Sequence, residues 1–363
     1  QTVPVHYMYQ RDIMRADYMS ITDHAYNRDP LNWHNYRKHR HLYNWPDAFL
    51  FLLGFELTAS NLQVVENTGH YNMHYFGDTD DAGVLAAKDP RQRAPERLWE
   101  ANAGKDFVTI PHHTADWQHY IDWDHYDDAH APVVEIFQDM RGTSEYLRAP
   151  GTTNFDQVQN PECFVSEALR RGHKVGFIAG GDHSGISLGA AHVSENREEP
   201  LKEALYARRT YGTTGIKPTI RFDVNGNGMG NVVPLEAHSA RAEVMLESRT
   251  KLDKAVLLRN SEEIHTFAVA RDGHIELEYV DEDAAEHVED RRIGSPSVYY
   301  YLRCHFAGNH LAWVSPVWLC SGQTEISAPS SFGSPDRPSS RTWRSTSTRR
   351  STRASRTIPK NTS

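Results

Sequence analysis

Side chains of the types that bind metals recur in the first half of this sequence, each time directly after a short apolar run. Asp23 and His24 follow such a run at 18–22, and Glu56 follows another at 49–55. Later runs lead in the same way into a His-His pair and an Asp-His pair. The full set is Asp23, His24, Glu56, His112, His113, Asp182 and His183, and Glu135 lies within a further run at 133–137. Imidazole and carboxylate groups bind Zn, Mn and Fe(II) in proteins, so this recurrence predicts a divalent-metal site.

Hydrolysis is the chemistry that such a site would perform. Two or three divalent ions lower the pKa of a bound water molecule, and the resulting metal-bound hydroxide needs no Ser, Cys or Lys nucleophile beside it. We predict that Glu56 bridges two ions while histidines fill the outer positions. Catalytic roles are assigned to Glu56 and Asp23. Asp23 has a second interpretation, in which its carboxylate only orients His24.

Short β-type runs alternate with longer polar or helical stretches between residues 18 and 179, which is typical of βα units and a mostly parallel sheet. The predicted strands are 18–22, 49–55, 107–110, 133–137 and 175–179. Helices are predicted at 161–171 and 200–209. In a barrel of parallel strands the C-terminal strand ends meet at one face, so the predicted ligands would converge on a single pocket.

A second group of candidate residues lies outside these strands. His70 is either a metal ligand or a turn residue, and Asn72 beside it is a candidate for binding substrate. Arg209 and Tyr211 are further candidates, because arginine can bind an anionic substrate through two hydrogen bonds. The alternative for Arg209 is a place at a helix C-terminus, where basic residues are favoured without any ligand. The acidic stretch 116–130 is expected to be a surface loop or a lid over the site.

Closely spaced alternating segments follow residue 216, which predicts antiparallel strands in a small β-sandwich-like module at 217–320. Tyr299, Tyr301 and Trp313 in this module suggest an alternative function, a non-catalytic carbohydrate- or metal-binding protein with a degenerate site. The competing interpretation places these aromatic side chains in the core or on a sheet face. Residues 321–363 are rich in Ser, Thr, Arg and Pro, so we expect a disordered basic tail.

Composition narrows the class of protein. With 363 residues, of which 39% are hydrophobic, the chain can form a large core. Its longest apolar run, 49–55, is far shorter than the roughly 20 residues of a membrane helix, and no signal peptide is recognisable. The net charge of −9 divides into +6 for the tail and −15 for the rest, which disfavours nucleic acid as the main partner. Three separated cysteines indicate no disulfide framework, and neither oligomeric state nor compartment can be inferred.

Seven short segments resemble the PHP (polymerase and histidinol phosphatase) superfamily of metal-dependent hydrolases, and within it the family called domain of unknown function 3604. The matching segments are Ile21-Thr22-Asp23-His24, Gly54-Phe55-Glu56, Gly69-His70-Tyr71-Asn72, Ile110-Pro111-His112-His113, Val134-Glu135-Ile136, Gly180-Gly181-Asp182-His183-Ser184 and Arg209-Thr210-Tyr211-Gly212-Thr213-Thr214-Gly215. The resemblance covers roughly residues 1–217.

The resemblance implies a distorted (β/α)7 barrel at 1–216 and a di- or trinuclear Zn, Mn or Fe centre. It also implies phosphoesterase-type hydrolysis of a small or glycan-related anionic substrate. Carried over by position, the implied metal ligands are His24, Glu56, His70, one of His112 and His113, Asp182 and His183. The leading hypothesis is therefore a metal-dependent phosphoesterase, with a metal-dependent amidohydrolase as an alternative, because the same ions would polarise an amide carbonyl.

The sequence departs from the family pattern at two places. PHP proteins open with a His-x-His motif on their first strand, whereas His6 stands alone here. We therefore expect the sequence to begin just after that strand and the barrel to lack it. The closing Asp-x-His of the superfamily is here the adjacent pair Asp182-His183.

Overall fold

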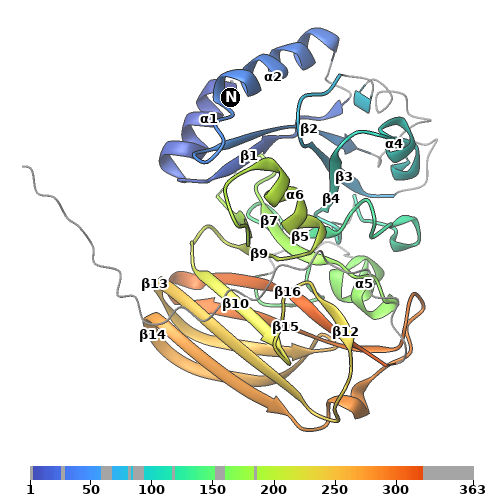
Figure 1. Ribbon diagram of the computed structural model, residues 1–363, viewed down its shortest axis with the longest axis vertical. Coiled ribbons are helices and arrows are strands. Elements are labelled where there is room, and N and C mark those ends of the chain that lie inside the picture. The colour runs from blue at the N-terminus through green and yellow to red at the C-terminus, as the bar shows by residue number, and fades with distance from the viewer. Residues whose placement is uncertain are drawn as a thin grey trace, which may run out of the picture. The chain divides into compact units, whose positions relative to one another are not determined.

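The computed structural model of the chain (Figure 1) describes residues 3–25, 29–58, 68–80, 83–84, 94–116, 119–151, 160–183 and 186–321. All of these residues lie within one compact unit, residues 1–326. The predicted tail at 321–363 lies outside the described residues except for Ser321. The described strands form three sheets.

The first sheet has four strands in the order β1-β2-β3-β4. They are β1 (Tyr18–Ile21), β2 (Leu50–Thr58), β3 (His70–Tyr75) and β4 (Phe107–His112). β1 is parallel to β2, whereas the other neighbours are antiparallel. Because β2 is a central strand that is covered on both faces, it is buried almost throughout, and its sequence reads as a nearly continuous apolar run.

Helix α2 (Pro30–Tyr43) covers one side of this sheet. It begins where the sequence supplies start signals, since Asp29 accepts a hydrogen bond from the backbone N–H of Asn32 and Pro30 occupies the first turn. Trp33 of α2 packs edge-on against Phe55 of β2, with ring centroids 6.3 Å apart. Before β1, α1 (Val3–Met8) is followed by a π-helical turn (Tyr9–Ile13), and farther along α4 (Pro95–Ala101) precedes β4.

The second sheet has three strands in the order β6-β5-β7. They are β5 (Val133–Gln138), β6 (Gly142–Thr143) and β7 (Gly176–Gly180). β5 and β7 are parallel, and helix α5 (Val165–Arg171) connects them in sequence. The helix predicted at 161–171 is divided, because the extended backbone of Phe164 separates a 3-10 turn (Pro161–Cys163) from α5. Gly172 ends α5 in the left-handed conformation, φ +110°.

The third sheet has nine strands and contains most of the second half of the chain. Its main path is β11-β10-β13-β15-β16-β9-β8, with β14 paired to β13 and β12 to β16. The strands are β8 (Leu188–Ala191), β9 (Thr210–Thr213), β10 (Thr219–Val224), β11 (Asn227–Gly228), β12 (Val232–Pro234), β13 (Ala240–Arg259), β14 (Glu262–Asp281), β15 (Ser297–Phe306) and β16 (His310–Cys320). Helix α6 (Glu198–Tyr206) lies between β8 and β9 in sequence.

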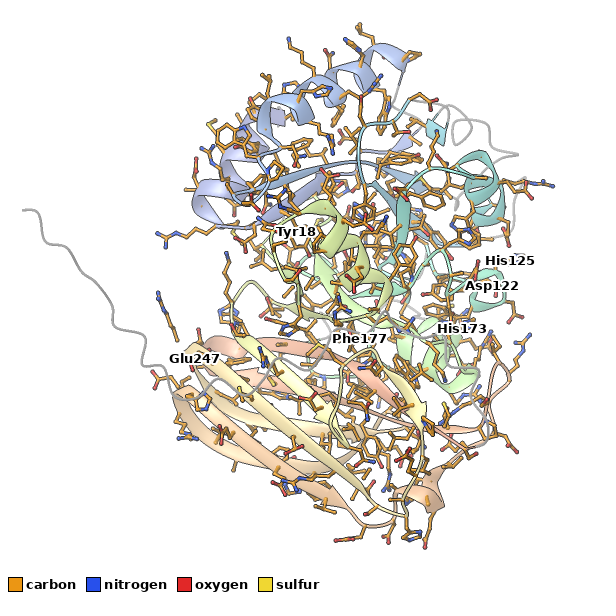
Figure 2. All side chains as sticks on the ribbon, viewed as in Figure 1. Tyr18, Asp122, His125, His173, Phe177 and Glu247 are labelled. Atoms are coloured by element: carbon orange, nitrogen blue, oxygen red, sulfur yellow. The ribbon has the colours of Figure 1, made fainter. Side chains whose placement is uncertain are left out.

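Aromatic side chains join the second sheet to the third. Phe137 of β5 stacks on Trp313 of β16, with ring centroids 5.3 Å apart. Phe177 of β7, labelled in Figure 2, meets Tyr301 of β15 edge-on at 5.4 Å. One hydrophobic core therefore runs from the second sheet into the third.

The predicted distorted (β/α)7 barrel is wrong. A parallel barrel needs a crossover helix between successive strands, but β2, β3 and β4 follow one another as antiparallel neighbours. β8 and β9 are also antiparallel to each other, and β9 continues into the third sheet through β16. The antiparallel strands predicted after residue 216 belong to a sheet that also includes β8 and β9, so this sheet begins before residue 217. The described chain is mostly β, with large antiparallel sheets.

Candidate metal centre

Strand register brings several predicted ligands to one face of the first sheet. Glu56 of β2 lies opposite Asn72 of β3, and His70 of β3 lies opposite His112 of β4. Because alternate residues of a strand point to the same face, these side chains share one side of the sheet. His24 joins them through a parallel bridge to Glu56. The first residue of antiparallel β3 thus lies level with the last residues of β2 and β4.

Glu56 is the centre of this cluster. Its Oε1 lies 2.9 Å from Nδ1 of His70 and 3.6 Å from Nε2 of His112, and its Oε2 lies 3.2 Å from Nδ1 of His24. Burial raises the pKa of Glu56, but the interactions with His112, His24 and His70 outweigh burial and hold this pKa well below its usual range. Glu56 is therefore a buried carboxylate in its anionic form, which is the form that binds a cation.

His70, His112 and His113 form a buried group with ring nitrogens that lie within 4.8 Å of one another. Burial lowers the pKa of His70 to about 4 and moves that of His113 well below its usual value. Both rings are therefore neutral near pH 7, and neutral imidazole is the form that binds metals. For His112 the pKa is raised instead, because the carboxylate of Glu56 outweighs the effect of burial.

One histidine near this group was not singled out by the sequence. The ring of His119 is stacked on that of His70 at 4.5 Å and lies 5.8 Å from that of His113. His119 belongs to the acidic stretch 116–130, in which other histidines pair with carboxylates elsewhere: His125 with Glu96 and His130 with Asp127. The spacing of residues in this stretch does not distinguish His119, which lies at the site, from His125 and His130, which do not.

Asp182 and His183 lie beside the Glu56 cluster and have different partners. The carboxylate of Asp182 is ion-paired with the guanidinium of Arg141, which also lies 3.1 Å from Asp116. His183 Nε2 lies 3.4 Å from Asp182, and its side chain is 63% exposed. The ring of His183 is 6.2 Å from that of His24. Arg141 was also missed by the sequence analysis, because it lies in a turn after β5 with no motif around it.

Glu135 of β5 adds a second buried carboxylate. Burial raises its pKa to about 8. Gln138 donates a hydrogen bond to Glu135 Oε1 at 3.0 Å. A β carbon on Gly180 would lie 2.6 Å from Glu135 Oε2, so the glycine of β7 leaves room for this carboxylate. The sequence includes Glu135 in the series of strands that predicts the site but does not identify it as a ligand.

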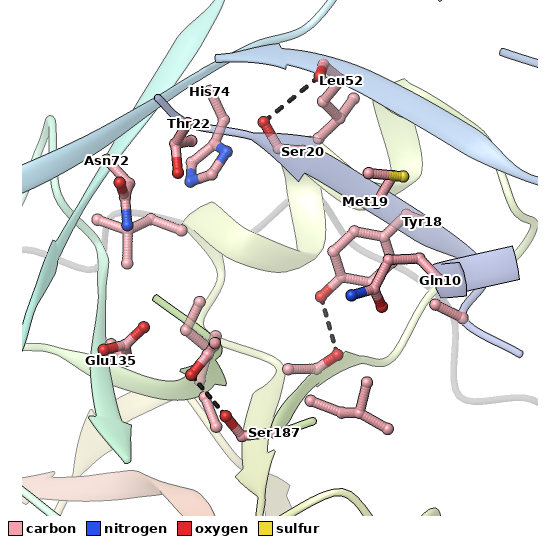
Figure 3. A pocket seen from close by; sticks show the side chains of 18 of the residues that line it. Gln10, Tyr18, Met19, Ser20, Thr22, Leu52, Asn72, His74, Glu135 and Ser187 are labelled. Atoms are coloured by element: carbon pink, nitrogen blue, oxygen red, sulfur yellow. Dashed lines mark hydrogen bonds between the residues drawn. The ribbon is translucent and has the colours of Figure 1, made fainter. Parts of the chain in front are cut away.

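A cavity of about 730 Å³ opens beside these residues. Figure 3 shows Thr22, Asn72 and His74 on one side of it and Glu135 across from them. The predicted site residues that line it are Asp23, His24, Glu56, Asn72, His112, Asp182, His183 and Tyr211. His70 and His113 are buried and are not among the lining residues.

Three of the predicted site residues have partners elsewhere in the protein. Asp23 accepts a hydrogen bond from the hydroxyl of Tyr36 on α2. Tyr211 donates to the backbone oxygen of Pro218 at 2.7 Å. Arg209 lies 3.3 Å from Glu203, three residues after the end of α6, and does not line the cavity.

The chemistry of the donor set fits a divalent transition metal. Imidazole nitrogens surround an anionic carboxylate, which suits Zn, Mn or Fe(II) better than Ca or Mg. Nδ1 of His113 is buried without a hydrogen-bond partner in the described part of the chain. Buried polar atoms normally have such partners, so this nitrogen is available to coordinate an ion. Glu56, His24, His70, His112 and His113 are thus the residues that would hold it.

Gly54 sets how closely β1, β2 and β3 approach one another next to the site. A β carbon at this position would lie 2.5 Å from Ser20 Oγ and 2.7 Å from the backbone oxygen of Met73. We expect Gly54→Ala to lower the free energy of unfolding by about 1–3 kcal/mol, because the backbone oxygen cannot move aside. Urea denaturation measures this change. Gly228→Ala is the control, since its β carbon would only reach 3.4 Å from Asp223, and equal losses in both variants would contradict the prediction.

Comparison with known proteins identifies relatives without a described activity. No protein-family model matches the chain. An uncharacterised protein of Chlamydia pneumoniae is 26% identical over 303 residues, covering 76% of this chain and 47% of that protein. Uncharacterised proteins of Chlamydia trachomatis and Chlamydia muridarum are each 28% identical over 273 residues, covering 65% of this chain and 43% of theirs. The chain therefore spans less than half the length of these relatives.

Among solved structures, an FMN-binding beta-glucuronidase from Faecalibacterium prausnitzii is 11% identical and covers 55% of this chain and 28% of its own. Its TM-score of 0.16 does not indicate a shared fold. No helix in the described ranges combines the length and hydropathy needed to cross a bilayer.

Proposed function

We propose that this chain is a metal-dependent hydrolase whose substrate is a small phosphoester. The supporting observation is the convergence of His24, His70 and His112 on the buried carboxylate of Glu56, with His113 beside them. Divalent ions bound there would lower the pKa of water and stabilise negative charge on the attacking and leaving oxygens. The site stands on the first sheet and its neighbours and does not require a barrel.

Several side chains of this chain have distinct roles at the proposed site. Glu56 supplies the central negative charge, and Thr58 donates a hydrogen bond to its Oε1 at 3.1 Å, which holds the carboxylate in place. Arg141 holds Asp182 at the edge of the cavity. Asn72 lines the cavity, and its amide oxygen is buried without a hydrogen-bond partner among the described residues, so it is placed to orient a substrate or its water.

Two alternative functions were considered from the sequence. The aromatic residues that suggested carbohydrate binding are at most 1% exposed (Tyr299, Tyr301 and Trp313), so they form no surface for a glycan. Amide hydrolysis uses the same metals and the same cavity, and substrate tests separate it from phosphoester hydrolysis.

Metal content and hydrolysis test the proposed function together. We expect purified protein to contain two or more equivalents of Zn, Mn or Fe by elemental mass spectrometry. With added Mn or Zn, it should hydrolyse p-nitrophenyl phosphate or bis(p-nitrophenyl) phosphate faster than p-nitroacetanilide. Protein treated with a chelator is the control and should lose turnover. Absence of bound metal, together with no thermal shift on metal addition, would refute the proposal, and faster anilide cleavage would favour an amidohydrolase.

A further inference from the structure

The cavity extends well beyond the Glu56 cluster. Its volume of about 730 Å³ lies within the range of roughly 300–1,000 Å³ that is typical of small-molecule sites. Carboxylates, histidines and Asn72 are among its lining residues, as are other polar residues such as Gln10 and Lys217. Five apolar residues of one hydrophobic cluster also line the cavity, and we call this part of its wall the apolar arm: Leu52, Ile178, Ala191, Leu201 and Leu205.

The walls of the apolar arm belong to a hydrophobic core. Leu52, Leu201 and Leu205 are buried members of one cluster, and Ile178 and Ala191 pack against it while remaining partly exposed. Their exposed area faces the cavity, since both residues line it. Apolar surface inside a protein gains free energy when a ligand removes it from water. The arm is thus built to receive an apolar group.

Three hydroxyl groups along the cavity donate hydrogen bonds within the protein. Tyr18 donates to a backbone oxygen at 3.0 Å, Ser187 to another at 2.5 Å and Ser20 to a third at 3.4 Å. Figure 3 shows these three hydrogen bonds, all within the protein. The protons of these three hydroxyl groups are therefore not available to a ligand, whereas the apolar side chains of the arm can contact a hydrocarbon group.

We propose that the apolar arm binds an alkyl or aryl group of the substrate, with the phosphoryl group of the same molecule at the Glu56 cluster. The substrate class is then an ester of phosphate with an apolar alcohol. The position of the phosphoryl group rests on the proposed function, whereas the apolar arm does not.

A series of n-alkyl phosphates tests the proposal by binding. Ethyl, butyl, hexyl and octyl phosphate are titrated calorimetrically into the Mn-loaded full chain, with inorganic phosphate as the reference. We expect Kd to fall about fourfold for each added methylene until the arm is full, as expected for transfer of a methylene out of water. A Kd that does not change with chain length would overturn the proposal.

A substitution in the apolar arm tests whether the dependence of Kd on chain length arises there. Ala191→Phe should fill part of the arm and reduce the preference for octyl over ethyl phosphate by at least tenfold, with metal content unchanged. Ala237→Phe makes the same substitution at an exposed loop position that does not line the cavity and should retain the full preference. Equal behaviour of the two variants, with both folded by circular dichroism, would place the binding elsewhere. The unsubstituted chain's own series decides the question if Ala191→Phe does not fold.

Straight-chain alcohols separate this inference from the proposed function. If metal-free protein binds octanol more tightly than butanol and the Ala191→Phe variant loses this difference, the apolar arm is supported even if no metal binds. If metal binds and phosphoesters are hydrolysed but chain length has no effect on Kd, the proposed function stands and the apolar arm is refuted.

Discussion

Replacing Glu56 with glutamine should remove at least one metal ion per chain. The substitution keeps the size of the side chain but removes the negative charge that faces His24, His70 and His112. Loss of a group that merely supports a ligand lowers metal affinity roughly 10–100-fold, and a direct ligand should cost more. Elemental mass spectrometry after gel filtration, with calorimetric titration of Mn or Zn, measures the loss. Hydrolysis should fall with the metal content.

A matched variant shows whether the loss is specific to the cluster. Glu247→Gln makes the same substitution on β13, where the side chain is 63% exposed and lies 3.4 Å from His274. Figure 2 labels Glu247 on the third sheet. Metal content should be unchanged in this variant. If folded Glu56→Gln protein also kept its full metal content, Glu56 would not be a ligand.

The positions of the strands in the first half of the chain were largely predictable. The apolar run at 49–55 overlaps β2 (Leu50–Thr58) from residue 50 onward, and the run at 133–137 falls inside β5 (Val133–Gln138). Such runs identify buried strands because a covered strand has no polar face. Strand direction is different, since it depends on which distant segments pair. The prediction that β2 and β4 belong to a parallel barrel failed at that step.

The candidate site shows the same division. Glu56 and His112 lie close together because both end a strand at the same edge, which a strand-end pattern could indicate. The pattern could not indicate that Asp182 is paired with Arg141 or that His119 stacks on His70, because loops bring these residues together. The spacing of a motif predicts which residues of one strand or helix lie close together. It does not predict contacts between residues of different loops and strands.

A buried ion pair links the loop after β6 to β15 of the third sheet. Glu145 Oε1 lies 2.8 Å from NH1 of Arg303 and accepts a hydrogen bond from Tyr301 at 2.8 Å. Its Oε2 accepts a hydrogen bond from Nε1 of Trp313 at 2.7 Å. Glu145 is 1% exposed and Arg303 is 0% exposed. Every contact of this carboxylate therefore lies within the protein core, where an unpaired charge is costly.

Arg303→Met should lower the free energy of unfolding by about 3–5 kcal/mol, because it leaves the Glu145 carboxylate buried without its cation. The double variant Arg303→Met/Glu145→Gln should be less destabilised, because it removes both charges. Arg241→Met is the matched control: Arg241 pairs with Glu278 at 2.7 Å, both side chains are about half exposed, and the expected loss is about 0–1 kcal/mol. The midpoints of urea denaturation, compared at an unchanged m-value, measure the stability of all three variants.

The effect of Arg303→Met should grow as pH rises. Burial raises the pKa of Glu145 even beside Arg303, and without the guanidinium this pKa should rise further. Below about pH 4.3 the carboxyl is protonated in both folded and unfolded chains, so it carries no penalty there. Above that pH the unfolded chain loses this proton first, and the variant loses up to about 1.4 kcal/mol per pH unit until the folded-state pKa is reached. The difference between Arg303→Met and the double variant should therefore widen from pH 5 to pH 8, and a constant difference would show that Glu145 is not a buried charge in the single variant.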